Sequence, residues 1–180
     1  MKTIALYGGS FDPPHIAHKA IVEALRKLDF IQKVVVMPTF LNPFKASFTA
    51  PAALRLQWLK KIFSSYEDVE VSSYEVEMKK KVPTVATVKH LLKKYDKVYL
   101  VIGADNLSSL HKWYRYDELK ELVTFIVATR DKIAIPKQFI MLEINEDVSS
   151  TDLRKNFDST KIPKEVAEEI TQYYKEHNAR

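Results

Sequence analysis

Short apolar runs alternate with helical segments along nearly the whole 180-residue chain, and this pattern predicts an α/β fold. Thr3–Tyr7 and Lys97–Ile102 are typical of buried strands, because each is apolar and leads toward a glycine. Between such runs, Ile16–Leu28 carries apolar residues at helical spacing. Strands separated by helices are joined in parallel by right-handed crossovers. We therefore expect a Rossmann-like, doubly wound, mainly parallel sheet with helices on both faces.

The alternation continues through the N-terminal half. Lys33–Met37 is rich in valine and stops at a proline, as a second strand would, and Thr39–Pro51 has the prolines and mixed aromatics of a loop. Ala52–Phe63 places its large apolar residues on one face and is expected to be an amphipathic helix. Two short strands are expected next, at Val69–Val71 and Tyr74–Val76.

The C-terminal half adds helices and two strands. Thr84–Tyr95 is expected to be a helix that opens on a threonine start signal. Val123–Thr129 and Phe139–Ile144 are apolar runs of strand length. The remaining helices are expected at Asp105–His111, Tyr116–Leu122, Thr151–Phe157 and Pro163–Glu176, the last with proline in its first turn.

Length and composition bound the function. They predict one domain over residues 1–180, with residues 148–180 as a C-terminal helical portion. The chain has no cysteine, which excludes disulfides, cysteine-based zinc sites and thiol nucleophiles. No apolar run approaches the roughly 18 residues that span a membrane, so we expect a cytoplasmic location and no membrane partner. Residues 1–90 carry the whole net charge of +5, which suits either solubility or an anionic ligand. Lys79–Lys81 lacks the interleaved aromatics of nucleic-acid binding and is expected to be a solvated loop.

The first candidate site follows the first strand. Gly8 and Gly9, two of only three glycines in the chain, lack a Cβ and let ligand phosphates approach their backbone N–H groups. His15 and His18 open the next helix, three residues apart, and so share one face of it. The helix N-terminus adds free N–H groups and a positive dipole end. We expect a phosphate site rather than a metal site, because zinc usually takes a third protein ligand.

A second candidate site lies near the C-terminus, in Val148–Arg154. Ser150 or Thr151 could cap the short helix that follows, and Arg154 lies about one turn further along the same face. Hydroxyls, free N–H groups and a guanidinium together make a cradle for phosphate. The alternative is an ordinary helix cap with a solvent-facing arginine.

Both segments resemble a known family. Gly8–His18 is similar to the signature of the nucleotidyltransferase superfamily, usually written with a His-x-Gly-His element, although Ala17 stands in place of the glycine. Ser149–Arg154 resembles that superfamily's Ser-Ser-Thr-x-Ile-Arg motif. Gly103–Asn106, followed by His111–Tyr114, looks like the middle motif of bacterial nicotinate mononucleotide adenylyltransferases. The resemblance covers nearly the whole chain, and Asn42-Pro43-Phe44-Lys45 and Thr84 fall where that family carries substrate contacts.

The resemblance implies a role for each matching residue. Catalytic roles are implied for His15, His18 and Arg154. Binding of ATP is implied for Gly8, Gly9, Ser10, Phe11, Gly103, Asp105, Arg130, Ser150 and Thr151. Binding of nicotinate mononucleotide is implied for Lys45, Thr84, Trp113 and Tyr114. Mg²⁺ would be held between the phosphates of ATP with few protein ligands, so no metal-binding residues are expected.

The family's reaction joins ATP and nicotinate mononucleotide into deamido-NAD and pyrophosphate, a step of NAD biosynthesis. Two other functions stay open. One is adenylyl transfer to another phosphorylated acceptor, such as phosphopantetheine, which would not need Trp113. The other is a non-catalytic nucleotide- or RNA-binding module that uses the basic N-terminal half, although no nucleic-acid partner is expected. The sequence leaves open whether the chain forms a homo-oligomer.

Overall fold

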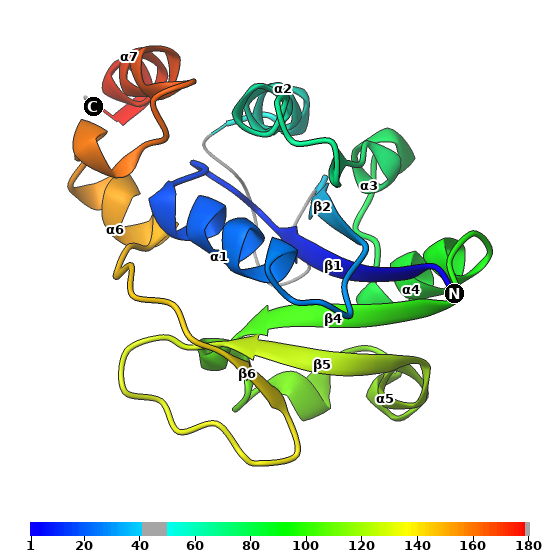
Figure 1. Ribbon diagram of the computed structural model, residues 1–180. Helices are drawn as coiled ribbons and strands as arrows, with labels where there is room; N and C mark the ends of the chain where they lie inside the picture. The colour runs from blue at the N-terminus through cyan, green and yellow to red at the C-terminus, as the bar shows by residue number, and fades with distance from the viewer. Residues whose placement is uncertain (41–49, 179–180) are drawn as a thin grey trace.

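The computed structural model describes residues 1–40 and 50–178. Its six strands form one sheet in the order β3-β2-β1-β4-β5-β6, and every pairing is parallel (Figure 1). The predicted Rossmann-like sheet is therefore confirmed. Strand order reverses between β1 and β4, and ligands of such sheets bind at that point, beyond the carboxyl ends of the strands. The strands are β1 Thr3–Gly9, β2 Lys33–Pro38, β3 Val69–Val71, β4 Lys97–Gly103, β5 Val123–Ala128 and β6 Ile140–Leu142.

Helices cover both faces of the sheet. Figure 1 shows α1 crossing in front of β1, with α2 and α7 above it, α6 to its left and α4 behind the sheet. The helices are α1 Ile16–Arg26, α2 Ala52–Ile62, α3 Tyr74–Met78, α4 Thr84–Leu92, α5 Tyr116–Leu122, α6 Ser150–Lys155 and α7 Ala167–Asn178. Short 3-10 turns form at η1 Ala104–Asn106, η2 Leu110–Lys112 and η3 Ser159–Lys161.

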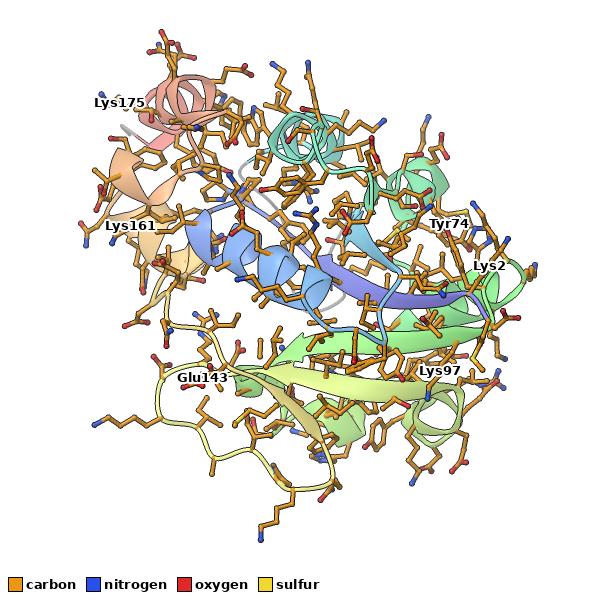
Figure 2. All side chains as sticks on the ribbon, viewed as in Figure 1. Lys2, Tyr74, Lys97, Glu143, Lys161 and Lys175 are labelled. Carbon is orange, nitrogen blue, oxygen red and sulfur yellow. The ribbon has the colours of Figure 1, made fainter. Side chains whose placement is uncertain are left out.

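Two hydrophobic cores lie on opposite sides of the sheet, and side chains fill the space on both sides (Figure 2). Successive residues of β1 alternate between them. Ala5 and Tyr7 pack on the side of α1 and α2, whereas Ile4 and Leu6 pack on the side of α4 and α5. Because both faces are covered, a central strand is apolar at every position, and this is why the strands appear as continuous apolar runs.

Two expected elements are wrong. Tyr74–Val76 is not a strand but the start of helix α3. The chain leaves the sheet edge at Ser72, whose Oγ accepts a hydrogen bond from the N–H of Tyr74 and turns the backbone into the helix. Asp105–His111 is not one α-helix but the two turns η1 and η2. There the Asn106 side chain donates to the Gly103 carbonyl, which competes with regular helical hydrogen bonding.

Helix starts also differ from expectation. Ser149, rather than Ser150 or Thr151, caps α6, and its Oγ accepts from the N–H of Asp152 at 3.0 Å. Thr84 is the first residue of α4 and makes no capping hydrogen bond, since Pro83 occupies the cap position. Helix α7 begins at Ala167, after a turn in which the Val166 N–H donates to the Pro163 carbonyl.

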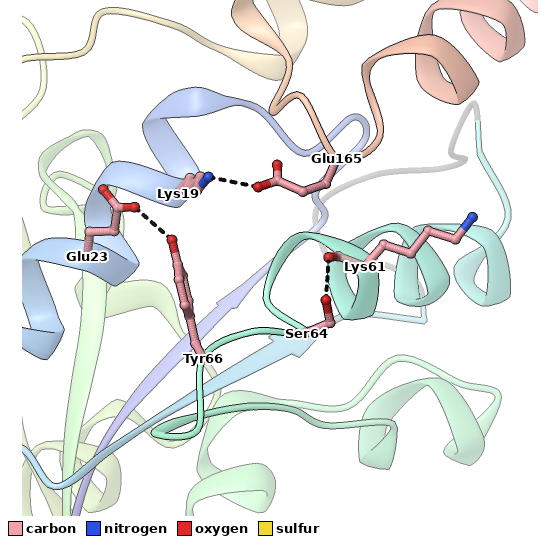
Figure 3. Close-up of polar contacts among 6 residues, drawn as sticks. All are labelled: Lys19, Glu23, Lys61, Ser64, Tyr66 and Glu165. Atoms are coloured by element: carbon pink, nitrogen blue, oxygen red, sulfur yellow. Dashed lines mark hydrogen bonds and ion pairs between the residues drawn. The ribbon is translucent and has the colours of Figure 1, made fainter.

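Polar contacts fasten the α1 side of the molecule. Lys19 of α1 pairs with Glu165, just before α7, at 3.1 Å, and the Tyr66 hydroxyl donates to Glu23 of α1 at 2.8 Å (Figure 3). Lys61 of α2 also pairs with Glu169 of α7. Exposed pairs of this kind contribute at most about 1 kcal/mol each. None of the helices among residues 1–40 and 50–178 is long and apolar enough to cross a membrane.

Candidate active site

A cavity of about 1220 Å³ opens at the carboxyl ends of β1, β2, β4 and β5, where the strand order reverses. The sequence predicts a ligand at this edge, and most of the predicted site residues come together there. Those that line the cavity are Gly8, Gly9, Ser10, Phe11, His15, His18, Thr84, Gly103, Asp105, Trp113, Tyr114, Arg130, Ser150 and Thr151. Lys45 and its neighbours Asn42, Pro43 and Phe44 lie outside the described residues.

The three glycines line the cavity and none has a positive φ, so backbone conformation does not require glycine at these positions. A Cβ on Gly103 would lie 2.5 Å from Oδ1 of Asp105, and one on Gly9 would lie 3.3 Å from the Phe11 ring. A Cβ on Gly8 would meet only the Met37 carbonyl, at 3.6 Å. Gly103 and Gly9 therefore make room for functional neighbours, whereas Gly8 is not required by the protein's own packing.

The loop between β1 and α1 is held in place by α2. Phe11 adopts a left-handed φ of 51°, which a non-glycine residue rarely does without support. Fully buried Arg55 of α2 supplies that support by donating to the carbonyl of Ser10 at 2.6 Å and of Thr39 at 2.9 Å. It also donates to the carbonyls of Ala50 and Phe40. These hydrogen bonds compensate the charge of Arg55, which would be costly to bury unpaired.

The other side of the same loop is held by the C-terminal helices. The Tyr174 hydroxyl of α7 and the N–H of Ala50 both donate to Oδ1 of buried Asp12. Arg154 of α6 donates to the carbonyl of Asp12 at 2.7 Å, and Ser150 Oγ donates to that of Pro13 at 2.8 Å. The loop that precedes the two histidines is thus fixed by three helices that are distant from it in sequence.

His15 and His18 bond to each other's backbone. Nδ1 of His18 accepts from the His15 N–H at 3.0 Å, and Nδ1 of His15 accepts from the His18 N–H at 3.4 Å. The two rings stack with centroids 3.6 Å apart. Since both Nδ1 atoms accept, a neutral ring carries its proton on Nε2. The helix start therefore offers two Nε2–H donors from one face.

Burial keeps both rings neutral. Burial, followed by the nearby Arg130 guanidinium, lowers the pKa of His15 to about 3. Burial, the neighbouring His15 ring and Arg130 hold the pKa of His18 well below its ordinary value. In the ligand-free protein the pair therefore supplies hydrogen-bond donors instead of charge. A polyphosphate bound against them would favour the protonated form.

Asp105 and Arg130 flank the cavity at the ends of β4 and β5. Arg130 Nη1 lies 3.9 Å from Oδ2 of Asp105, and both side chains are about half exposed. Neither is sealed in the core, so both remain accessible to a ligand. Thr151, which also lines the cavity, accepts from Arg154 Nη2 at 3.3 Å. The guanidinium of Arg154 thus reaches the site residue Thr151 while it also holds Asp12.

The cavity is also lined by the start of α4 and the turn after η2. Thr84, Trp113 and Tyr114 lie here, and Tyr114 is 64% exposed. The Nε1 atom of Trp113 is buried and has no hydrogen-bond partner among the described residues. A buried donor without a partner is rare in proteins and marks a place where a ligand or a water completes the bonding.

Several residues at the cavity were not predicted from the sequence as site residues. Lys81, expected in a solvated loop, is exposed but lines the cavity, and buried Glu75 and Thr87 line it beside Thr84. Arg55 could have been found, because it stands three, four and seven residues before Trp58, Leu59 and Ile62, on the buried face of α2. Glu75 gave no such signal, since its burial depends on how α3 and α4 meet. Further lining residues are Tyr7, Asp131, Lys132, Asn145, Glu146 and Asp147.

A parallel sheet with a cavity at its carboxyl edge is typical of nucleotide-binding α/β proteins, and comparison with known proteins identifies the family. The cytidylyltransferase-like family model matches residues 6–156, so the chain belongs to that family. Within it, the chain belongs with the nicotinate-nucleotide adenylyltransferases. It is 59% identical over 180 residues to the probable nicotinate-nucleotide adenylyltransferase of Sulfurimonas denitrificans, covering 100% of this chain and 99% of the relative. The Campylobacter fetus protein of the same name is 47% identical, covering 98% of this chain and 99% of that protein.

Solved structures agree on the fold. The chain is similar to the Plasmodium falciparum nicotinic acid mononucleotide adenylyltransferase in complex with NaAD, with a TM-score of 0.82 and 22% identity over 100% of both chains. The same protein in complex with APC gives a TM-score of 0.78. The resemblance drawn from the sequence motifs is thereby confirmed at the level of the family.

Proposed function

We propose that this chain transfers the adenylyl group of ATP to nicotinate mononucleotide. The acceptor phosphate oxygen attacks the α-phosphorus, the bond to the β-phosphate oxygen breaks, and deamido-NAD and pyrophosphate result. The observation that carries this proposal is that one cavity is lined both by the two histidine donors at the start of α1 and by Trp113 with the start of α4. Helices α1 and α4 pack on opposite faces of the sheet. A single cavity lined from both sides suits two substrates that must meet.

The ATP end works by positioning and charge stabilisation. Backbone N–H groups of Gly8–Phe11 and the Nε2–H groups of His15 and His18 donate to the triphosphate. His18 is assigned to the oxygens of the α-phosphate, where negative charge grows as the new bond forms. No covalent intermediate is needed, in keeping with the absence of cysteine.

The leaving pyrophosphate is assigned to the start of α6. Ser150 and Thr151 line the cavity there, and Arg154 touches Thr151. A guanidinium has five N–H donors, so Arg154 can keep its bond to the Asp12 carbonyl while it donates to a phosphate. Asp105 is assigned to the ribose hydroxyls of ATP, and Arg130 to the adenine.

The acceptor end is assigned to the pyridine ring. Trp113 stacks on the ring, and backbone N–H groups at Thr84 and Tyr114 donate to its carboxylate. The free N–H groups of the first helical turn at Thr84 favour an anion, whereas a neutral amide would satisfy them less well. Lys45 is assigned to the phosphate of the mononucleotide.

Mg²⁺ fits this site as a companion of ATP. Carboxylates such as Asp105 and Asp131 line the cavity, but within residues 1–40 and 50–178 no three metal-binding side chains converge. Mg²⁺ commonly keeps phosphate and water ligands with few from protein. Bound to ATP, it would neutralise charge on the phosphates.

The substrate assignment is tested with an acceptor panel. Enzyme, ATP and Mg²⁺ are mixed with nicotinate mononucleotide, nicotinamide mononucleotide or phosphopantetheine, and pyrophosphate release is followed. We expect fastest release with nicotinate mononucleotide. Faster release with phosphopantetheine would favour the sister activity, and ATP binding without release for any acceptor would favour a non-catalytic module.

The role of His18 is tested by substitution. His18→Ala removes an Nε2–H donor from the α-phosphate, and we expect kcat to fall about 10²–10³-fold. His177→Ala, at an exposed histidine of α7, is the matched control and should leave kcat unchanged. A His18→Ala enzyme with wild-type kcat would contradict the assignment.

A further inference from the structure

The proposed adenylyl transfer gives no role to Glu75, a buried carboxyl beside the acceptor end of the cavity. Glu75 of α3 lines the cavity although it is only 6% exposed. Its Oε2 accepts a hydrogen bond from the Thr87 hydroxyl at 2.8 Å, and Thr87 also lines the cavity. Thr87 stands three residues after Thr84, which places both on one face of α4. Glu75 is therefore bonded to the helix turn whose free N–H groups are assigned to the acceptor carboxylate.

Charged side chains on α3 and on the elements around it are either engaged elsewhere or exposed. In α2, Arg55 holds backbone carbonyls and Lys61 pairs with Glu169. In β2, the titratable residue is Lys33, which pairs with Glu70. In α4, Lys89 pairs with Glu118 and His90 stacks on Tyr74, which Figure 2 labels. Lys60 of α2, Glu77 of α3 and Lys79–Lys80 are exposed.

Lys81, six residues after Glu75 in the chain, is a cation that lines the cavity. It is exposed, so solvent screens its charge. Burial accordingly dominates and raises the pKa of Glu75 to about 7, against the smaller lowering effect of the Thr87 hydrogen bond. The carboxyl is thus poised between its neutral and ionised forms near neutral pH.

We infer that Glu75 is a specificity-determining residue of the acceptor end, whose neutral carboxyl admits a carboxylate-bearing acceptor and whose ionised form repels it. The inference rests on the proposed function, because it needs the acceptor carboxylate at the start of α4. A neutral amide on the acceptor would not feel the change. The preference for acid over amide therefore falls as pH rises through the range in which Glu75 ionises.

The size of the effect depends on how close the two charges lie. Glu75 is bonded to the Thr87 hydroxyl at 2.8 Å, and Thr87 lies one helical turn from Thr84, so a carboxylate bound at the Thr84 N–H would lie near Glu75. Two negative charges at such a separation, in an environment of intermediate dielectric constant, change an affinity by about tenfold or more. We expect a change of about tenfold, since the mouth of the cavity is open to solvent.

The test is the ratio of kcat/KM for nicotinate mononucleotide to that for nicotinamide mononucleotide between pH 6 and 8.5. Titration of the acceptor phosphate or of groups at the ATP end cancels in this ratio. In the wild type we expect the ratio to fall about tenfold as pH rises. Glu75→Gln keeps a hydrogen-bond acceptor for Thr87 but cannot ionise, so its ratio should stay at the wild-type value of pH 6. Glu77→Gln, on exposed α3 surface, is the matched control and should follow the wild type.

A second measurement needs no turnover. Calorimetry of nicotinate mononucleotide binding at pH 7.5 in buffers of different ionisation enthalpy reports proton uptake, and the wild type should take up more protons than Glu75→Gln. Equal uptake, or a Glu75→Gln ratio that falls with pH like the wild type, would overturn the role of Glu75. Absence of any turnover with nicotinate mononucleotide would instead overturn the proposed function, so the two failures are distinguishable.

Discussion

At the scale of single residues, Gly8 leaves space beside its backbone N–H that a side chain would partly fill. Gly8 has no positive φ, and a Cβ there would meet only the Met37 carbonyl at 3.6 Å. Gly8→Ala should therefore leave the free energy of unfolding unchanged or raise it by up to about 1 kcal/mol. If a phosphate of ATP approaches this N–H closely, the added methyl group should raise KM for ATP by about tenfold or more. Thermal unfolding and steady-state kinetics check this, and an unchanged KM would contradict a phosphate contact at Gly8.

His15 and Glu75 make the free energy of unfolding depend on pH in opposite directions. The pKa of His15 is lowered from 6.5 to about 3, so the unfolded chain binds more protons between these values and stability falls as pH falls through them. The pKa of Glu75 is raised from 4.5 to about 7, so the folded chain binds more protons there and stability falls as pH rises through that range.

Glu75→Gln should consequently stabilise the protein in alkaline solution. At pH 8 the wild type bears the full cost of ionising Glu75, and the variant should gain up to about 3 kcal/mol in free energy of unfolding. At pH 5 most of this gain should vanish, because Glu75 is then neutral in the folded protein. Urea denaturation at both pH values measures the difference. A gain that is equal at pH 5 and pH 8 would mean that ionisation of Glu75 is not its source.

At the scale of elements, helices far from the cavity set its shape. Tyr174 of α7 bonds to Asp12, in the loop that leads to the histidines, and no described residue of α7 lines the cavity. Tyr174→Phe leaves Asp12 without this donor and should lower the free energy of unfolding by about 1–3 kcal/mol. It should also raise KM for ATP several-fold as the loop loosens. Tyr66→Phe, which removes an exposed bond to Glu23, is the control and should leave KM for ATP unchanged.

Element type could be predicted wherever periodicity was long. The helix over 16–28 and the strand over 97–102 were recognisable because many residues repeat one pattern. The strand predicted at Tyr74–Val76 was wrong, because a pattern of three residues cannot distinguish a strand from a helical turn. The single helix predicted over Asp105–His111 was wrong, because the side chain of Asn106 bonds to the backbone and two short turns form instead.

At the scale of the whole molecule, motif residues were predictable and their environment was not. Glycines, histidines and hydroxyl residues lie where strand ends meet, so a parallel sheet was enough to gather them into one cavity. The neutral state of His15 and His18 depends on burial and on Arg130, which is more than a hundred positions away. The contact between Glu75 and Thr87 likewise depends on two helices meeting in space, which no local pattern records.

The anchored loop has a thermodynamic consequence for ligand binding. Ser10 and Asp12 are held by Arg55, Arg154 and Tyr174 before any nucleotide arrives. Ordering a flexible residue costs roughly 1–2 kcal/mol of conformational entropy, and here that loss is taken during folding. Binding of ATP should therefore carry a smaller conformational-entropy penalty at this loop, so that more of the enthalpy of its phosphate contacts contributes to affinity.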